Sequence, residues 1–207
     1  MAQNLLSVVI LISGSGTNLQ ALIDARPTSN YQIAAVISSD PQALGLKRAK
    51  KSGIETLTIE HESFGSRVEF DSFLALTINQ FNPSLIVLAG FMRILGHTFI
   101  RQFHGRIVNV HPSLLPKYPG LNTHQRAIQD EQKVHGVTVH YVTEALDGGP
   151  IIAQEEVPIL SDDTAEVLAA RVLEKEHVIY PKVINLIALG KIQMENGKVI
   201  FDKSILC

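Results

Sequence analysis

The sequence predicts an α/β fold in which helices cover both faces of a doubly wound, mostly parallel sheet. Short runs rich in Val, Ile and Leu alternate with amphipathic segments through the first half of the 207-residue chain. Strands that are buried on both faces of a parallel sheet have this composition. In the C-terminal half, two strand-like segments alternate polar and apolar residues, which favours antiparallel or edge strands. The sheet is therefore predicted to be parallel first and to gain antiparallel strands later.

In the first half, apolar runs predict strands and the amphipathic segments between them predict helices. The predicted strands are residues 5–13, 31–39, 54–59, 84–90 and 106–110. The predicted helices are residues 18–25, 43–53 and 66–82. Gly53 closes the second helix, because glycine readily takes the left-handed conformation found at helix ends. Pro83 ends the third helix, because proline has no N–H to donate and disfavours helical geometry in the preceding residue.

The second half is predicted to contain two strands, one long helix and a closing hairpin. These elements are residues 135–144, 150–159, 162–190 and 191–201. Asp162 or Asp163 is the expected N-cap of the helix, and Pro181 is expected to kink or divide it. The hairpin is expected to turn at Asn196-Gly197, a pair that favours a tight turn with positive φ. The chain shows no linker or internal repeat, so residues 1–207 are predicted to form a single domain.

The composition argues against nucleic-acid and membrane partners. The net charge is −2, and no basic stripe runs along the chain. The densest basic cluster, residues 47–53, is interpreted as a solvated helix end. No apolar run reaches the ~18 residues of a membrane-spanning helix, and the N-terminus lacks the positive start of a signal peptide. The only cysteine is Cys207, which excludes an intramolecular disulfide, so a cytoplasmic location is expected.

The segment SGSGTN, from Ser13 to Asn18, joins the first predicted strand to the first predicted helix. Its Gly-x-Gly turn would expose backbone N–H groups at the positive end of the helix dipole, which favours an anion. Leu19 stands where a dinucleotide-binding motif has its third glycine, and the lysine of a P-loop is missing. The loop therefore suits one phosphate better than a pyrophosphate. An ordinary strand-to-helix turn is the alternative.

Asn109 and His111 come at the carboxyl end of a predicted strand and, two residues apart, face the same side of it. Open α/β sheets bind ligands outside this end, where an amide and an imidazole can stabilise a negatively charged oxygen. Asp147, in the turn LDGGP, would stabilise the protonated histidine if the fold brought the two together. The alternatives are a turn-capping asparagine, a structural histidine before Pro112, and an ordinary turn at Asp147.

The segment LAGFMRIL, residues 88–95, follows another predicted strand. Its apolar side chains suit a flat heteroaromatic ring, and Arg93 suits a carboxylate. An ordinary loop with a surface arginine is the alternative.

No metal site and no enzyme nucleophile are predicted. His135 and His140 are five residues apart on a predicted strand, so they face opposite sides and are interpreted as hydrogen-bonded structural residues. No Gly-x-Ser-x-Gly motif occurs, and Cys207 is too close to the end of the chain to be an expected nucleophile.

Several longer motifs, taken in order, resemble the phosphoribosylglycinamide formyltransferases, a family of folate-dependent enzymes of purine synthesis. The motifs are ISGSGTNLQALID, VLAGFMRIL, NVHPSLLPKYPGLNTH, HGVTVHYVTEALDGGPIIAQ and EHVIYP, and the resemblance runs from about Val8 to Lys191. It implies a Rossmann-like formyltransferase fold with one continuous sheet. The first half, about residues 1–105, would bind phosphate and substrate. The second half, about residues 106–207, would bind folate and contain the catalytic residues. The implied co-substrate is 10-formyltetrahydrofolate, and the implied acceptor is 5-phosphoribosylglycinamide, in a monomer or homodimer.

Carried over residue by residue, the resemblance implies three sets of site residues. The catalytic set is Asn109, His111 and Asp147. The acceptor-binding set is Gly16, Thr17 and Asn18 for the phosphate and Glu176 for the glycinamide end. The folate-binding set is Arg67, Met92, Arg93, Ile94, Leu95 and Asn109. The nucleophile is then the substrate amine, which accounts for the lack of a nucleophile motif in the chain.

Three other activities stay open. Formyltetrahydrofolate hydrolase shares the Asn/His/Asp set, but it carries an N-terminal regulatory domain for which the residues before Leu5 are expected to leave no room. Methionyl-tRNA formyltransferase shares SLLP but adds a tRNA-binding domain, which is not expected here because no basic tail follows. A non-catalytic nucleotide-binding module would use the Gly-x-Gly turn but would not need Asn109, His111 and Asp147.

Overall fold

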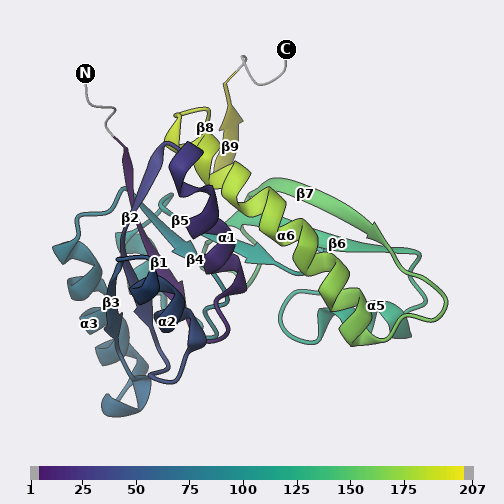
Figure 1. Cartoon of the computed structure of the whole chain (residues 1–207), viewed down its shortest axis with the longest axis horizontal. Coiled ribbons are helices and arrows are strands. Elements are labelled where there is room, and N and C mark those ends of the chain that lie inside the picture. Colours follow the sequence, from purple (N-terminus) through teal and green to yellow (C-terminus); the bar gives the residue numbers. More distant parts are fainter. Residues whose placement is uncertain (1–4, 203–207) are drawn as a thin grey trace.

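A computed structural model describes residues 5–202 as a twisted sheet with helices on both faces (Figure 1). The strands are β1 (Leu6–Ile12), β2 (Tyr31–Ser38), β3 (Glu55–Thr58), β4 (Leu85–Leu88), β5 (Ile107–His111), β6 (Val134–Tyr141), β7 (Ile151–Pro158), β8 (Ile192–Glu195) and β9 (Lys198–Phe201). The helices are α1 (Thr17–Ala25), α2 (Leu44–Lys51), α3 (Arg67–Gln80), α4 (His97–Gln102), α5 (Thr123–Gln129) and α6 (Ala165–Ala188). Two short 3-10 segments are η1 (Arg26–Thr28) and η2 (His61–Ser63).

The main sheet has seven strands in the order β3-β2-β1-β4-β5-β6-β7. The pairs from β3 to β5 are parallel, whereas β5–β6 and β6–β7 are antiparallel. The predicted parallel sheet with later antiparallel strands is therefore confirmed. β8 and β9 form a separate hairpin, in which Asn196 and Gly197 have the predicted positive φ.

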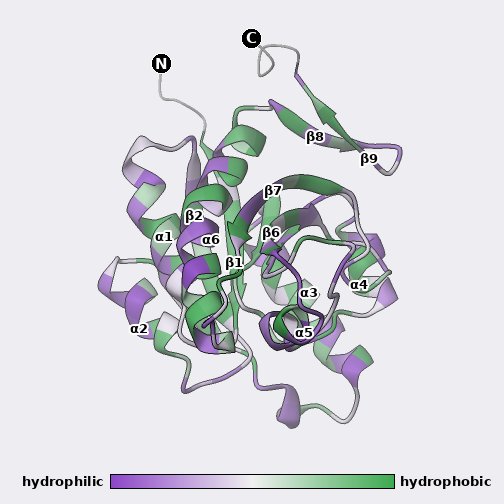
Figure 2. Ribbon diagram, turned by 90° about the vertical axis from the view of Figure 1, so that its right-hand side faces the viewer, coloured by the Kyte–Doolittle hydropathy of each residue, from purple (hydrophilic) through white to green (hydrophobic). Residues whose placement is uncertain are grey.

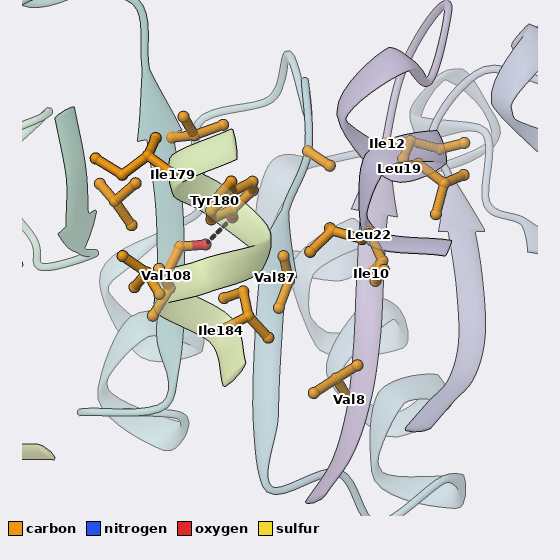
Figure 3. Packing of buried hydrophobic residues seen from close by; sticks show 14 of the residues in the cluster. Val8, Ile10, Ile12, Leu19, Leu22, Val87, Val108, Ile179, Tyr180 and Ile184 are labelled. Carbon is orange, nitrogen blue, oxygen red and sulfur yellow. Dashed lines mark hydrogen bonds between the residues drawn. The ribbon is translucent and has the colours of Figure 1, made fainter. Parts of the chain in front are cut away.

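β1 separates two hydrophobic cores, because its alternate residues face opposite sides of the sheet. Val8, Ile10 and Ile12 pack with residues of α1, α2 and α6 (Figure 3). Val9 and Leu11 pack with residues of α3 and α4 on the other face. All five side chains are fully buried, which explains why this strand is apolar at successive positions. Figure 2 shows the hydrophobic character of β1 at the centre of the sheet, whereas the helices around it carry both hydrophobic and hydrophilic residues.

The N-cap predicted for the long helix is wrong. α6 begins after Thr164, whose hydroxyl oxygen accepts a hydrogen bond from the backbone N–H of Val167 at 3.3 Å. Neither Asp162 nor Asp163 caps the helix. Asp163 is instead bound to both terminal nitrogens of Arg171, at 2.7 and 2.8 Å, and this charged pairing takes precedence over capping.

The helix is continuous through Pro181, so the expected division does not occur. A proline inside a helix removes one backbone hydrogen bond, and the burial of α6 against the sheet outweighs that loss. The short helices α4 and α5 were not predicted. They have six and seven residues, which is too short for helical periodicity to show in the sequence.

The strand order places the candidate loops at one edge of the sheet. The chain runs outward from β1 to β3 and then returns to β4 on the other side of β1. Ligands bind outside the carboxyl ends of the strands at such a reversal. The SGSGTN loop follows β1 and the segment before α4 follows β4, so both predicted binding segments lie at this edge.

We expect Leu22→Ala to lower the free energy of unfolding by about 2–5 kcal/mol. Leu22 is fully buried in the core that α1 shares with the sheet. Leu76→Ala is the control, because Leu76 is 65% exposed on α3, and it should change the free energy by less than about 0.5 kcal/mol. Urea unfolding followed by circular dichroism measures both values, and equal losses would contradict the packing described.

Candidate active site

The loop after β1 presents backbone donors at the start of α1. Gly16 is the N-cap of α1 and has a φ of 69°, a left-handed conformation that favours glycine. Within residues 5–202, the backbone N–H groups of Ser15, Gly16 and Thr17 have no hydrogen-bond acceptor. Free N–H groups at the positive end of a helix dipole are suited to bind a phosphate.

Two glycines allow α2 to pack closely against this loop. A Cβ on Gly16 would lie 2.5 Å from Gly45 Cα, and a Cβ on Gly45 would lie 2.5 Å from Ile12 Cδ1. Arg48 of α2 also donates from Nε to the carbonyl oxygen of Ser15 at 3.0 Å. Contact with α2 therefore holds the conformation of the loop.

Asn18, in the first turn of α1, meets Glu176 of α6. Asn18 Nδ2 donates to Glu176 Oε2 at 2.6 Å, and both side chains are buried. Burial raises the pKa of the Glu176 carboxyl, and the hydrogen bond from Asn18 opposes that increase. Asn18 Oδ1 is buried and has no hydrogen-bond partner in the described part of the chain. Asn18 Oδ1 and the carboxylate of Glu176 can both accept hydrogen bonds. The two side chains therefore suit a ligand that donates hydrogen bonds, such as an amine or hydroxyl.

β5 ends where the sheet changes from parallel to antiparallel pairing. Asn109 is level with Leu88 of β4 on one side and with His140 of β6 on the other, and His111 is level with Thr138. Residues 109 and 111 lie on the same face of the strand, as the spacing predicts. The antiparallel register adds His140 directly beside Asn109.

His140 orients the amide of Asn109. His140 Nδ1 lies 2.9 Å from the carbonyl oxygen of Tyr141, which can only accept, so Nδ1 carries a hydrogen. Burial lowers the pKa of His140, which favours the neutral ring. Nε2 then has a lone pair and accepts a hydrogen bond from Asn109 Nδ2 at 3.3 Å. The second amide hydrogen of Asn109 is left for another acceptor.

Asp147 approaches both histidines from the turn between β6 and β7. Its Oδ2 lies 3.6 Å from His111 Nδ1, and its Oδ1 lies 3.9 Å from His140 Nε2. The backbone N–H of Gly120 donates to Asp147 Oδ2 at 2.8 Å. The carboxylate is only 11% exposed, so it interacts with the imidazole of His111 with little screening by water.

Glycines explain how this turn reaches the site. Asp147 itself has a φ of 48°, a left-handed conformation that aspartate tolerates better than most residues. A Cβ on Gly149 would overlap the carbonyl oxygen of Tyr141, and a Cβ on Gly148 would lie 2.9 Å from the Cβ of Ala145. The turn can therefore pack directly against the end of β6 because these positions have no side chain.

His111 is held from its other side by the loop that follows β5. His111 Nε2 lies 2.9 Å from the carbonyl oxygen of Tyr118, so Nε2 carries a hydrogen and donates it. The imidazole thus lies between a backbone carbonyl and the carboxylate of Asp147. These two contacts fix the plane of the ring. The Nε2 hydrogen of His111 is donated to the Tyr118 carbonyl in this structure.

The segment between β4 and α4 combines exposed and buried side chains. Met92 and Ile94 are 70% and 62% exposed, whereas Leu95 is buried in the core beneath α3 and α4. Arg93 is exposed and lies 2.7 Å from His61, measured from Nη2 to Nδ1. Exposed apolar side chains beside a guanidinium suit a flat ring that carries a carboxylate.

Asp71 joins α3 to this segment. Its Oδ2 accepts a hydrogen bond from the backbone N–H of Gly96 at 2.8 Å and lies 3.8 Å from Arg67 Nε. Burial raises the pKa of the Asp71 carboxyl, and the Gly96 hydrogen bond and the charge of Arg67 oppose the increase. Arg67 therefore lies near the segment that contains Arg93, although the two are far apart in the sequence.

Two cavities lie near these residues. The first has a volume of about 550 Å³ and is lined by Ser13, Ser39, Asp40, Pro41, Glu60, His61, Glu62, Met92 and Arg93. The second has a volume of about 580 Å³ and is lined by Thr143, Gly148, Gly149, Pro150, Ile151, Gly197, Lys198, Val199 and Phe201. Asn109, His111 and Asp147 line neither cavity. This part of the site is defined by the contacts of Asp147 with His111 and His140 and by the contact of His140 with Asn109.

Residues 6–184 match the family described as formyl transferase. The chain belongs to this family. It is 45% identical to the phosphoribosylglycinamide formyltransferase of Escherichia coli (strain K12), over 95% of this chain and 94% of that protein. It is also 45% identical to the trifunctional purine biosynthetic protein adenosine-3 of Homo sapiens, over 95% of this chain but 20% of that protein. The solved structure of the phosphoribosylglycinamide formyltransferase of Coxiella burnetii is 51% identical, with a TM-score of 0.92 over 96% of this chain and 94% of that chain.

Residues 5–202 of this formyl transferase contain neither a membrane-spanning helix nor a cluster of metal-binding side chains. No helix there is long and apolar enough to cross a membrane. No group of three or more His, Cys, Asp or Glu side chains there is placed to hold a metal ion. Cys207 lies outside the described residues, so the expectations about it stay predictions.

The structure of this formyl transferase brings three groups of predicted residues together. They are Asn109 with His111 and Asp147, Asn18 with Glu176, and Arg67 with the segment 92–95. Sequence reasoning missed the contacts of two residues. His140 was interpreted as structural, yet it contacts Asn109 and Asp147, and Tyr118 binds His111 through its backbone. A backbone carbonyl carries no sequence signal, and the position of His140 depends on strand register.

A buried histidine pair lies near the site. His124 of α5 and His135 of β6 pack edge to face, with ring centroids 5.1 Å apart. Burial lowers the pKa of His135 from 6.5 to about 4, and the charge on His124 adds to this effect. Below pH 6.5 the unfolded chain therefore binds a proton that the folded chain does not. The contribution of neutral His135 to the free energy of unfolding is therefore fully present above about pH 6.5. It is lost as the pH falls toward about 4.

We expect the free energy of unfolding to fall less steeply between pH 6.5 and 4 in His135→Gln than in the unaltered protein. The slopes of the free energy of unfolding against pH should differ by the equivalent of about one bound proton, because the variant no longer has this titrating group. Denaturant unfolding at several pH values gives the slopes. His104→Gln is the control, since His104 is exposed and should leave the slope unchanged. A slope for His135→Gln equal to that of the unaltered protein would contradict the assignment.

Proposed function

We propose that this chain transfers the formyl group of 10-formyltetrahydrofolate to the glycinamide amine of 5-phosphoribosylglycinamide, a step of de novo purine synthesis. Nearly full-length similarity to proteins named phosphoribosylglycinamide formyltransferase supports the reaction. The observation that carries the proposal is the cluster of Asn109, His111 and Asp147 at the end of β5. An amide and an imidazole on one face of a strand, with a carboxylate beside the imidazole, suit an acyl-type transfer through a negatively charged oxygen.

The acceptor would bind between α1 and α6. In this proposal, the N–H groups of Gly16, Thr17 and Asn18 hold its phosphate, and Glu176 receives its glycinamide end. The unpaired donors at the start of α1 and the buried Asn18–Glu176 pair support this placement. The amine would then lie near the carboxyl end of β5, which belongs to the same edge of the sheet.

Formyl folate would bind along the segment before α4. Met92 and Ile94 offer exposed apolar surface, and Arg67 and Arg93 offer positive charge for carboxylates. Leu95 is buried, so it would act by anchoring the segment or through its backbone. Asn109, also assigned to this set, would meet the formyl group. These residues thus fit a flat, acidic co-substrate.

The reaction starts when the substrate amine attacks the formyl carbon and the formyl oxygen becomes negatively charged. Asn109 would donate its free amide hydrogen to this oxygen, and protonated His111 would donate a second hydrogen bond. One such donor typically lowers the barrier by about 2.7–4 kcal/mol. Asp147 would stabilise the charged His111 and position a water that carries a proton from the amine to the folate nitrogen. The bond between that nitrogen and the formyl carbon then breaks, and the formyl group stays on the acceptor. General acid–base assistance of this kind is commonly worth about 10²–10⁴-fold in rate.

The contact between His111 and the backbone of Tyr118 constrains this mechanism. The Nε2 hydrogen of His111 is donated to the Tyr118 carbonyl in the structure described. To reach the formyl oxygen with that hydrogen, the enzyme must shift the loop that carries Tyr118 or rotate the imidazole. Binding of both substrates would therefore be coupled to a small rearrangement of the loop after β5.

We infer a cytoplasmic enzyme that works as a monomer or homodimer and needs neither metal nor nucleic acid. Residues of about 1–105 would supply the phosphate loop, and residues of about 106–207 would supply the catalytic strand and turn. The shared seven-stranded sheet supports treating residues 1–207 as a single formyltransferase domain.

The test is a formyl-transfer assay with a 10-formyl folate analogue, with and without 5-phosphoribosylglycinamide. We expect deformylated folate to form only when the acceptor is present. Release of formate without the acceptor would instead support a formyltetrahydrofolate hydrolase. No product in either mixture, with nucleotide binding retained, would support a non-catalytic nucleotide-binding module.

We expect His111→Ala to lower kcat by at least about 10²-fold, because it removes one donor to the oxyanion and the partner of Asp147. Binding of a folate analogue, followed by quenching of intrinsic fluorescence, should change by less than about threefold, since His111 lies outside the 92–95 segment. His104→Ala is the control, because this histidine is exposed and lies outside the site. Near-normal turnover in His111→Ala would remove His111 from the mechanism.

A further inference from the structure

We propose that Tyr180 is a positioning residue for formyl transfer. Its hydroxyl fixes the peptide group before Asn109 and the peptide group that begins the segment leading to Met92, and so sets how the donor and acceptor meet. This inference rests on the function proposed above.

The Tyr180 hydroxyl joins two neighbouring strands from the side of α6. It lies 2.8 Å from the carbonyl oxygen of Leu88 and 3.0 Å from that of Val108, and Figure 3 shows the bond to Val108. Tyr180 is fully buried, so no water competes for these bonds. A hydroxyl shared by two carbonyl oxygens constrains the spacing of β4 and β5 at their carboxyl ends.

Both carbonyl groups lead directly into the candidate site. The carbonyl of Val108 belongs to the same planar peptide unit as the backbone nitrogen of Asn109, so the two move together. The carbonyl of Leu88 belongs to the peptide that begins the segment leading to Met92. A shift of either peptide group would therefore move a group that is proposed to contact the formyl donor.

The same face of α6 also holds the acceptor side of the site. Glu176 precedes Tyr180 by one helical turn, and residues four apart lie on one face of a helix. Glu176 binds Asn18 of the phosphate loop at 2.6 Å. Two neighbouring side chains of α6 thus connect the phosphate loop to the ends of β4 and β5. The motif EHVIYP contains both residues, and the proposed mechanism uses only the first of them.

Tyr31 shows what a purely structural buried tyrosine does in this fold. It is fully buried, and its hydroxyl donates to the carbonyl oxygen of Leu22 at 2.8 Å. Leu22 lies inside α1, and its peptide leads to no proposed site residue. Tyr31 and Tyr180 therefore match in burial and hydrogen bonding and differ in what they hold in place.

The test compares Tyr180→Phe with Tyr31→Phe, each of which removes one buried hydroxyl. We expect Tyr180→Phe to lower kcat by about tenfold, because Asn109 is displaced from the oxyanion, with KM for both substrates within about twofold. Tyr31→Phe should lower Tm by a similar amount and leave kcat within about twofold. A kcat for Tyr180→Phe that is within about twofold of the Tyr31→Phe value would overturn the proposal.

A second measurement does not depend on activity. The NMR resonance of the Asn109 side-chain amide should shift in Tyr180→Phe and stay in place in Tyr31→Phe. If the Asn109 resonance does not shift in Tyr180→Phe, the role of Tyr180 is refuted. If the protein without any substitution has no formyl-transfer activity, the proposed function is refuted instead. If Tyr180→Phe does not fold, 3-fluorotyrosine at position 180 keeps the hydroxyl and makes it a stronger donor. The Asn109 resonance should then shift as well, and its failure to do so would overturn the proposal.

Discussion

β5 pairs in parallel with β4 and antiparallel with β6, and the candidate site depends on this change of direction. The parallel side brings the end of β5 next to the end of β4, where the segment before α4 begins. The antiparallel side places His140 level with Asn109 and makes the chain turn back through Asp147. One strand therefore supplies Asn109 and His111 and also determines which groups surround them.

Polar groups at the end of a buried strand are costly unless each has a partner, and most of those here do. The amide of Asn109 is held by His140, the imidazole of His111 by Tyr118, and the carboxylate of Asp147 by Gly120. These partners orient Asn109 and Asp147 before a substrate arrives, whereas in the proposed mechanism His111 must exchange its contact with Tyr118 for one with the formyl oxygen. Catalysis by oriented dipoles requires such preorganisation, because no free energy is then spent on reorienting them during the reaction.

The loops of the site are held by close contacts with rigid elements. Gly16 and Gly45 allow α2 to touch the loop between β1 and α1, and Gly149 allows the Asp147 turn to pack against β6. On the opposite face of the sheet, the buried carboxylate of Asp71 binds the backbone of the segment before α4. Each loop is thus tied to a helix or strand at one or two points, which places functional groups more accurately than a free loop does.

The sequence by itself determined the features that depend on local periodicity. Continuous apolar runs indicated the parallel strands, and a spacing of two residues indicated that Asn109 and His111 share a face. Only the tertiary structure decided which distant groups meet these two. Those groups are His140, Asp147 and Tyr118. The tertiary structure likewise decided that Glu176 meets Asn18 and that the Tyr180 hydroxyl bonds the carbonyl oxygen of Val108. The physical reason is that such contacts depend on strand register and helix packing between segments far apart in the chain, whereas periodicity reports only the orientation of neighbouring residues.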